Sequence, residues 1–283
     1  MFGIQILEQV ELGLRGFKAE TQGGMLRVQA QASTDLAAMV GKTKELLKAR
    51  AADETAIAAR NLRKSQNNLR QIGFALHNAH DTYKYFPPAA LCDKQGKPCL
   101  SWRVAILPYL GQPNLYNQFK LDEPWDSPHN IKLLAQMPKV YAAPGLTTKE
   151  PGLTYYQGFI ADPKLGPEHA TAWETTVVPN SPFGAVGTRM PASFPDGTSN
   201  TIFVVEAGEA VPWTKPADLS YDPKKPLSKL GGIFKGGFNA LFVDASVGLV
   251  PQDFDVPTLR LLITRADGQP LGPAMDRIRF AKR

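Results

Sequence analysis

NLRKSQNNLRQIGFALHNAHDTYKYFPP, residues 61–88, is the stretch that decides the fold. An apolar stripe repeats through it every seven residues, with a second set three residues after the first: Leu62, Leu69, Leu76 and Tyr83, then Ser65, Ile72 and Ala79. This spacing places the stripe on one face of a helix of roughly five or more turns. Pro87 and Pro88 prevent the helix from continuing, because proline lacks an amide proton and restricts the preceding residue.

The other face of this predicted helix is polar. Its members are Arg63, Lys64, Asn67, Arg70, Asn78 and Asp81. A narrow seven-residue seam can also pair helices between chains, but a sheet in the same chain needs a covering layer. We therefore expect the stripe to be buried within the chain. The oligomeric state stays open.

Upstream of this helix, apolar residues alternate over residues 4–32, and ThrGlnGlyGly at 21–24 interrupts them. The first alternating set is Val10, Leu12 and Leu14, and the second is Leu26, Val28 and Ala30. This pattern predicts a two-stranded hairpin with a glycine-containing turn. SerThrAsp at 33–35 can cap a helix that runs to about Leu47, and residues 50–54 then form a joint. We expect residues 1–52 to be the remnant of an upstream domain and residues 53–283 to form the main domain.

Downstream, the pattern predicts short helices and one mostly antiparallel sheet. The helical segments are 102–110, 115–119, 130–137 and 255–265, and the strands are 155–160, 175–178, 201–206 and 240–244. Residues 91–100 are expected to form a turn between short extended segments, and 161–200 an irregular surface. The last residues, 273–283, are expected to be weakly ordered. The fold class is therefore α+β.

Bulk composition excludes several classes of function. Lysine and arginine outnumber aspartate and glutamate by 32 to 26, which gives a net charge of +6. The basic excess is scattered apart from RNLRK at 60–64 and the tail at 277–283. Because nucleic-acid-binding proteins concentrate basic residues on one face or place aromatics beside them, we expect no nucleic-acid partner. No apolar window of about 18 residues and no signal-peptide core occurs, so we expect no membrane span.

Two pairs of reactive side chains stand close in sequence. His77 and His80 lie three residues apart near the helix end, where two ligands make a poor zinc site and capping of the last carbonyls is the better interpretation. Cys92 and Cys99 flank a predicted turn that brings them within reach of a disulfide. Without an export signal, free thiols are favoured over a bridge.

Two loops are candidate sites. Asp122, Glu123 and Asp126 surround Trp125, which we expect to enter the core. Their oxygens suit calcium, but the segment lacks a glycine-containing ligand loop, so aspartate capping of nearby amides is the favoured role.

The second loop, AspGlyThrSerAsn at 196–200, precedes a strand and predicts a tight turn in which Gly197 supplies positive φ. Its second possible role is an interaction edge. The candidate interaction residues are Trp125, Asp126, Asp196, Gly197, Thr198 and Asn200.

The sequence contains no motif that places a base beside a nucleophile, and no phosphate-binding glycine loop. We therefore expect neither catalysis nor a cofactor.

Consecutive blocks of this chain carry a resemblance to a known family. In order, they are NNLRQIGFALHNAHDTYKYFPPAA, GKPCLSWRVAILPYL, LYNQFKLDEPWDSPHNIKLLAQMP, FPDGTSNTIFVVEA, VPWTKP and FNALFVDASV, within residues 57–268. Together they resemble the large planctomycete family known as domain of unknown function 1559. The resemblance implies a pilin-like or pseudopilin-like fold, with a long helix on an antiparallel sheet, and an exported or cell-envelope location. It implies no chemical activity.

The chain departs from the family pattern at two places. Many members carry a histidine ten residues before an AspGly pair, and here Phe234 precedes Asp244 and Ala245. A cysteine that members often show before ProSer is Ala143, before ProGly. Any function of that histidine or cysteine is therefore absent here. Met1 opening a fragment or a shortened gene product is one explanation for the missing prepilin segment.

Three hypotheses follow. The first is a non-enzymatic structural or interaction module with protein partners. The second is a hydrolytic or ligand-binding domain, with the Trp125 loop and the 196–200 loop as opposite walls of one pocket. The third is a surface that binds an acidic polymer through residues 60–64 and the tail.

Overall fold

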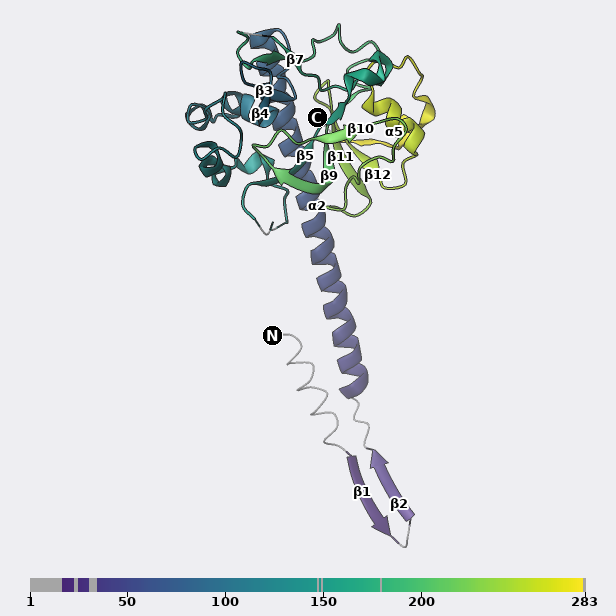
Figure 1. Cartoon of the computed structure of the whole chain (residues 1–283). Coiled ribbons are helices and arrows are strands. Elements are labelled where there is room, and N and C mark those ends of the chain that lie inside the picture. The colour runs from purple at the N-terminus through teal and green to yellow at the C-terminus, as the bar shows by residue number, and fades with distance from the viewer. Residues whose placement is uncertain are drawn as a thin grey trace. The chain divides into compact units, whose positions relative to one another are not determined.

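The structure is a computed structural model that describes residues 17–22, 25–30, 35–146, 148, 150–178 and 180–281. Contacts between residues divide the chain into two compact units, Met1–Ala59 and Arg60–Arg283. Helix α2, Asp35–Tyr83, is continuous and contributes to both (Figure 1).

The first unit contains a two-stranded hairpin and the first part of α2. β1, Phe17–Gln22, pairs antiparallel with β2, Met25–Ala30, which confirms a hairpin here but places Thr21 and Gln22 in a strand instead of the predicted turn. The expected strand around Val10–Leu14 lies outside the described residues. The predicted joint at 50–54 is wrong, because these residues are helical. They contain no glycine or proline, and Arg50 Nε bonds Glu54 Oε1 one turn away at 3.0 Å.

The second unit is built on a five-stranded antiparallel sheet with the order β13-β12-β11-β9-β5. In chain order the strands are β5 Leu153–Gln157, β9 Ile202–Pro212, β11 Gly237–Phe242, β12 Val247–Pro251 and β13 Arg279–Phe280. The long helix and the antiparallel sheet confirm the α+β class. The expectation of a weakly ordered tail is wrong, since β13 pairs with Gly248 and Leu249 and follows the 3-10 helix η6, Gly272–Arg277.

Three smaller two-stranded pieces surround this sheet. They are β3 Ala90–Cys92 with β4 Pro98–Ser101, β6 Phe159–Ala161 with β10 Leu219–Tyr221, and β7 Thr176–Val177 with β8 Ala185–Val186. The first confirms the predicted turn between short extended segments. The prediction that 175–178 joins the main sheet is wrong, because β7 pairs with β8 alone, where both strands are two residues long.

Short helices connect these strands, and several match the predicted segments. They are α3 Trp102–Ala105, η1 Leu107–Leu110, α4 Pro113–Tyr116, η2 Asn130–Gln136, η3 Lys139–Tyr141, η4 Pro163–Leu165, η5 Pro167–His169 and α5 Val256–Ile263. The predicted cap of α5 is confirmed, since the Asp255 carboxylate accepts the Thr258 amide at 2.8 Å.

The apolar stripe of α2 is buried against one face of the sheet, as predicted. Leu69, Ile72, Leu76 and Ala79 each have 0% exposure. Alternate residues of β11 point to opposite faces, so Leu241 joins the α2 cluster while Ala240 and Phe242 pack with α5. The sheet is therefore an inner layer between α2 and α5 (Figure 1).

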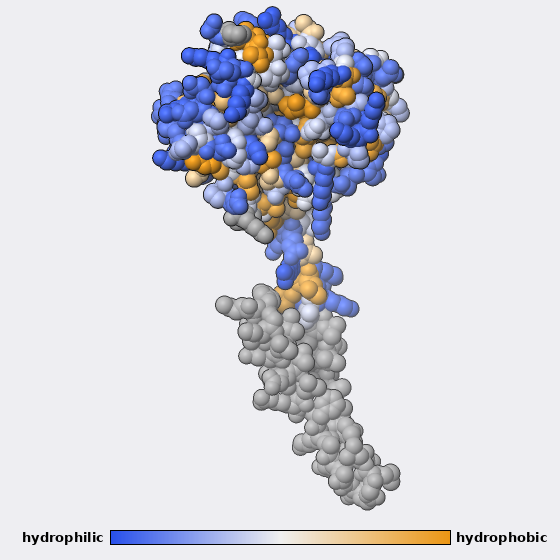
Figure 2. Space-filling model, viewed as in Figure 1, coloured by the Kyte–Doolittle hydropathy of each residue, from blue (hydrophilic) through white to orange (hydrophobic). Residues whose placement is uncertain are grey.

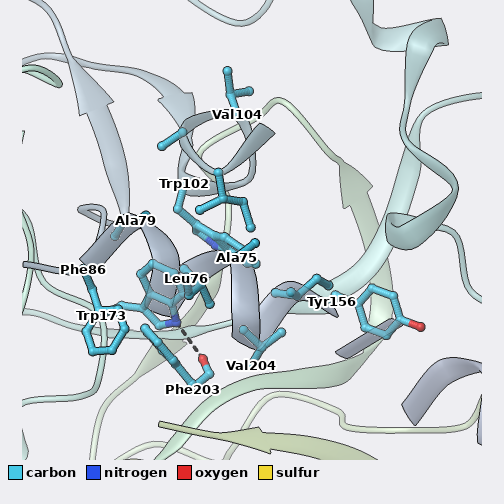
Figure 3. Packing of buried hydrophobic residues seen from close by; sticks show 14 of the residues in the cluster. Ala75, Leu76, Ala79, Phe86, Trp102, Val104, Tyr156, Trp173, Phe203 and Val204 are labelled. Atoms are coloured by element: carbon cyan, nitrogen blue, oxygen red, sulfur yellow. Dashed lines mark hydrogen bonds between the residues drawn. The ribbon is translucent and has the colours of Figure 1, made fainter. Parts of the chain in front are cut away.

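An aromatic group closes the core beside the C-terminal end of α2. Phe86, in the stretch that follows the helix, meets Phe203 of β9 edge to face, and Trp173 stacks on Trp102 at 4.7 Å between ring centroids. The Trp173 indole donates to the Phe203 carbonyl at 2.6 Å, as the dashed line in Figure 3 shows. The buried indole nitrogen is thereby satisfied inside an apolar cluster.

Helix α2 lies close to the turn between β11 and β12 at Gly73. A Cβ atom at position 73 would lie 2.9 Å from Leu241 Cδ1 and 3.2 Å from the Ala245 Cβ. Ala245 itself has φ of 67°, a left-handed conformation that favours glycine. The helix and the turn therefore constrain each other at these two positions.

We predict that Ala245→Gly stabilises the protein. Glycine adopts the left-handed conformation at position 245 without the steric cost that alanine has there. This gain exceeds the cost of the greater entropy of glycine in the unfolded chain by about 1 kcal/mol, which corresponds to about 2–4 °C in Tm. Thermal unfolding followed by circular dichroism measures the change.

Gly73→Ala provides the paired experiment. It is expected to cost about 1–3 kcal/mol in the natural background because of overpacking, and less once Ala245 is glycine. Additive effects of the two substitutions in a double-mutant cycle would contradict the proposed contact.

Candidate functional site

The most concentrated polar group of the second unit lies between helix α2 and the sheet. Its centre is Glu206 of β9, which has 0% exposure. The Ser65 hydroxyl donates to one carboxylate oxygen, and the Asn239 side-chain amide donates to the same atom at 3.0 Å. The Asn239 backbone amide donates to the other oxygen at 2.7 Å. Burial raises the pKa of Glu206 above its ordinary value.

A chain of hydrogen bonds links this carboxylate to the surface. The Tyr156 hydroxyl lies 2.7 Å from the Ser65 hydroxyl, and the Asn68 amide donates to the Tyr156 oxygen at 3.4 Å. Tyr156 is itself 0% exposed. Donors on α2 and β11 therefore converge on one carboxylate of β9, and Ser65 also bonds Tyr156 of β5, so the network ties the helix to three strands.

A second buried charge lies on the other side of Tyr156. Arg103 of α3 has 0% exposure, and its Nη2 lies 2.8 Å from Asp218 Oδ1. The guanidinium also donates to the Tyr156 carbonyl from Nε at 3.0 Å. Asp218 Oδ1 also accepts the Gly158 amide at 2.8 Å and the Trp102 indole at 3.2 Å, so three donors converge on this one oxygen.

These groups do not form a catalytic constellation. Ser65 is bonded to a carboxylate and a phenol inside the core, where a substrate has no access, and a catalytic base must reach the proton that it abstracts. The arrangement fixes the helix on the sheet.

Cavities at the surface of the second unit include the following two. One, of about 290 Å³, borders the β3–β4 hairpin and includes Cys92, Asp122 and Phe183. The other, of about 360 Å³, lies between α2 and the segment 139–145, and Asn68 is part of its wall. Neither cavity contains Trp125 or a residue of 196–200.

The two histidines contact other segments and do not cap the helix, which corrects the predicted role. His77 Nε2 donates to the Val243 carbonyl at 2.7 Å, and His80 Nε2 accepts the Met190 amide at 3.1 Å. Both lie on the side of α2 that packs against the domain, so their nitrogens meet neighbouring backbone before they can reach the last carbonyls. Burial lowers the pKa of His80, consistent with a neutral acceptor.

Cys92 and Cys99 are buried free thiols on β3 and β4. Burial raises the pKa of Cys92 to about 11 and also raises that of Cys99. Both therefore carry little thiolate at neutral pH and are poor nucleophiles.

Trp125 is half-buried against the edge of the core, with Lys215 Nζ 5.4 Å from its ring centroid. The expected aspartate caps are not what fixes this loop. The Asn130 amide donates to the carbonyls of Lys120, Glu123 and Pro124, because a buried asparagine reaches several carbonyls at once. A hydrogen bond from Lys120 lowers the pKa of Glu123. Among the described residues, no cluster of three or more acidic, histidine or cysteine side chains has the geometry to hold a metal ion.

The tight turn predicted at 196–200 is confirmed. Gly197 has φ of 102°, and the Asn200 amide donates to the Asp196 carbonyl at 2.8 Å. The Asp196 carboxylate accepts the amides of Asp267 and Gly268, at 2.7 and 3.0 Å, so it anchors the C-terminal segment. No hydrogen bond, ion pair or ring contact of the described chain joins this loop to the Trp125 loop.

Sequence reasoning missed Glu206, Arg103 and Asp218. The sequence holds a signal for the first two. Ser65 is a hydroxyl within an otherwise apolar stripe, and Arg103 interrupts the apolar run 102–107. A polar residue at a predicted core position requires a buried partner, although its identity depends on tertiary structure.

Comparison with models of known families matches residues 57–225 of this chain, more than half of its length, to a family described as "Protein of unknown function (DUF1559)". Neither the curated proteins nor the solved structures contain a match. Within the described part of the chain, no helix is both long and apolar enough to span a membrane.

We predict that Glu206 makes stability depend on pH. Its raised pKa means that the folded state holds the proton more tightly than the unfolded state. The stabilisation is therefore complete below the ordinary value of 4.5 and is lost as pH rises through the folded pKa. In urea unfolding from acid to neutral pH, the stability of the natural protein relative to Glu206→Gln should fall.

Glu209→Gln is the matched control, because Glu209 lies on the same strand and is exposed. Its difference from the natural protein should stay constant over the same range. Parallel pH curves for the natural protein and Glu206→Gln would contradict the assignment.

Asp218→Ala is expected to cost about 3–5 kcal/mol of unfolding free energy, since it leaves the Arg103 guanidinium buried without its counter-charge. Denaturant unfolding measures this cost. Asp222→Ala is the matched control. The partner of Asp222, Lys225, has a side chain that is 78% exposed, so this loss should be much smaller than that of Asp218→Ala. Similar losses for the two variants would show that the buried pair is not the stronger constraint.

Proposed function

The chain belongs to the DUF1559 family, and we propose that it is a non-enzymatic, pilin-like structural or interaction module whose partners are proteins. Helix α2 is the contact element in this proposal. One observation carries it: three large apolar side chains on the part of α2 within the first unit face solvent. Leu46 is 52% exposed, Leu47 is 61% exposed and Ile57 is 50% exposed.

These three residues lie on one side of the helix, where the charged Arg50 and Asp53 fall between Leu46 and Ile57. Leu46 and Ile57 are eleven residues apart, about three helical turns, so they lie nearly in line, and Leu47 widens the same side. Figure 2 shows hydrophobic surface on the described part of this helix. Clustered exposed apolar residues mark interaction surfaces more often than isolated ones do.

The charges around this face favour a second copy of the same helix as the partner. Both signs occur within one short segment, at Lys42, Lys44, Glu45, Lys48, Arg50, Asp53 and Glu54. Some of them already pair within the helix, as Lys48 does with Glu45 at 3.1 Å. A face with interspersed charges can be complementary to itself, whereas a single-sign face repels a second copy.

The interior supports a structural role. The buried ionisable groups Glu206, Arg103 and Asp218 each form several hydrogen bonds with neighbouring residues. Glu206 secures α2 on the sheet, and the Arg103–Asp218 pair joins α3 to the backbone of β5. The Trp125 loop and the 196–200 loop remain predicted secondary contact surfaces.

The test is the double variant Leu46→Gln/Ile57→Gln, which keeps helix propensity but removes the apolar face. Sedimentation velocity over a concentration series should show self-association of the natural protein that is at least about tenfold weaker in this variant.

Thr55→Gln is the matched control, because residue 55 lies half a turn away from Leu46 on the helical wheel and should leave association unchanged. Circular dichroism verifies that the helix persists in both variants. A monomeric natural protein at every concentration, or an unaffected double variant, would refute the role of this face.

A further inference from the structure

The cavity between α2 and the segment 139–145 has the composition of a ligand site. Its volume of about 360 Å³ lies within the range of small-molecule sites, about 300–1,000 Å³. Val140 and the stretch 142–145 supply an apolar wall, and α2 supplies a polar one with Lys64, Asn68 and Gln71. Lys139 stands on the opposite rim.

The charged residues that line this cavity are all positive. Lys64 and Lys139 both line it, and no aspartate or glutamate does. Neither ammonium has an ion pair or hydrogen bond within the described residues, whereas Lys120 and Lys225 pair with neighbouring carboxylates. Two unpaired cations at one concave site favour an anion, which would neutralise their mutual repulsion.

The α2 wall of the cavity adds hydrogen-bond acceptors. Asn68 is only 7% exposed. Its amide nitrogen is occupied, donating to the Ala142 carbonyl at 3.2 Å and to Tyr156 at 3.4 Å. The Gln71 amide nitrogen likewise donates to the Asn67 carbonyl at 3.4 Å. The side-chain oxygens of both amides accept no hydrogen bond within the described chain, so each is free to accept from a ligand hydroxyl.

These two features together restrict the ligand. Sulfate offers acceptors to the lysines but no donor to the two amide oxygens, and hydrogen phosphate has a single hydroxyl for both of them. A neutral sugar offers donors but no charge. We propose that this cavity binds a small hydroxylated carboxylate of sugar-acid type. Lys64 and Lys139 contact the carboxylate, and Asn68 and Gln71 accept from the hydroxyl groups.

The bound ligand also reaches the buried network. Asn68 connects the cavity, through Tyr156 and Ser65, to Glu206. A ligand that orders the Asn68 side chain would stabilise the hydrogen bonds that fix α2 on the sheet. Ligand binding should therefore raise the unfolding temperature as well as occupy the surface.

The experiment is a nuclear magnetic resonance titration of the full chain with glucuronate, observing the side-chain amide signals of Asn68 and Gln71. Glucose serves as the uncharged control and sulfate as the control without hydroxyls. Glucuronate should shift both amide signals and bind at least about tenfold more tightly than either control. Raising the ionic strength should weaken glucuronate binding, because both lysines are exposed.

Variants distinguish binding of glucuronate at this cavity from non-specific attraction of an anion to a basic protein. Lys64→Gln and Lys139→Gln should each weaken glucuronate binding about tenfold, while Lys164→Gln, the same charge change outside the cavity, should not. Circular dichroism verifies folding of each variant. Absent glucuronate binding, sulfate binding as tight as glucuronate, or an equal effect of Lys164→Gln would overturn the proposal.

Discussion

The contact between the α2 stripe and the sheet is the constraint on which the second unit depends. Each fully buried leucine or isoleucine of the stripe contributes about 1.5–3 kcal/mol of transfer free energy. The remaining elements complete the core around this contact, with α5 covering the opposite face of the sheet. The aromatic group around Trp173 closes the end where α2 stops.

Polar residues inside this apolar contact determine how it is made. A buried carboxylate is costly unless donors surround it, and Glu206 receives them from α2 and from β11. Arg103 and Asp218 form a second buried polar group beside β5. Arg103 donates to the Tyr156 carbonyl there, and Asp218 accepts the Gly158 amide. Apolar burial supplies most of the stabilisation, whereas these two groups select one arrangement among the compact alternatives.

Sequence periodicity predicted the parts of the fold that depend on local pattern. The stripe, its stop before Pro87, the α5 cap and the Gly197 turn are examples, because each follows from residues within one turn or repeat. The break at 50–54 was wrong, since charged helix formers continue a helix as readily as they end one. The partners of Ser65 and Asn68 could not be predicted, because Tyr156 and Glu206 are 91 and 141 residues from Ser65 along the chain. For the candidate site residues, the sequence predicted the Trp125 loop and the 196–200 loop, but not the segments that these loops contact.

The stripe itself has an ambiguity that two small residues remove. A pattern that repeats every seven residues looks the same after the helix slides along the sheet by one repeat. Such a slide would bring Ile72 to the place of Ser65, opposite Glu206, and His80 to the place of Gly73, against Ala245. The first exchange leaves a buried carboxylate without its hydroxyl donor, and the second forces an imidazole into a space with no room for a Cβ. Ser65 and Gly73 therefore define the register of an otherwise periodic helix. They allow it to pack on the sheet in one position only.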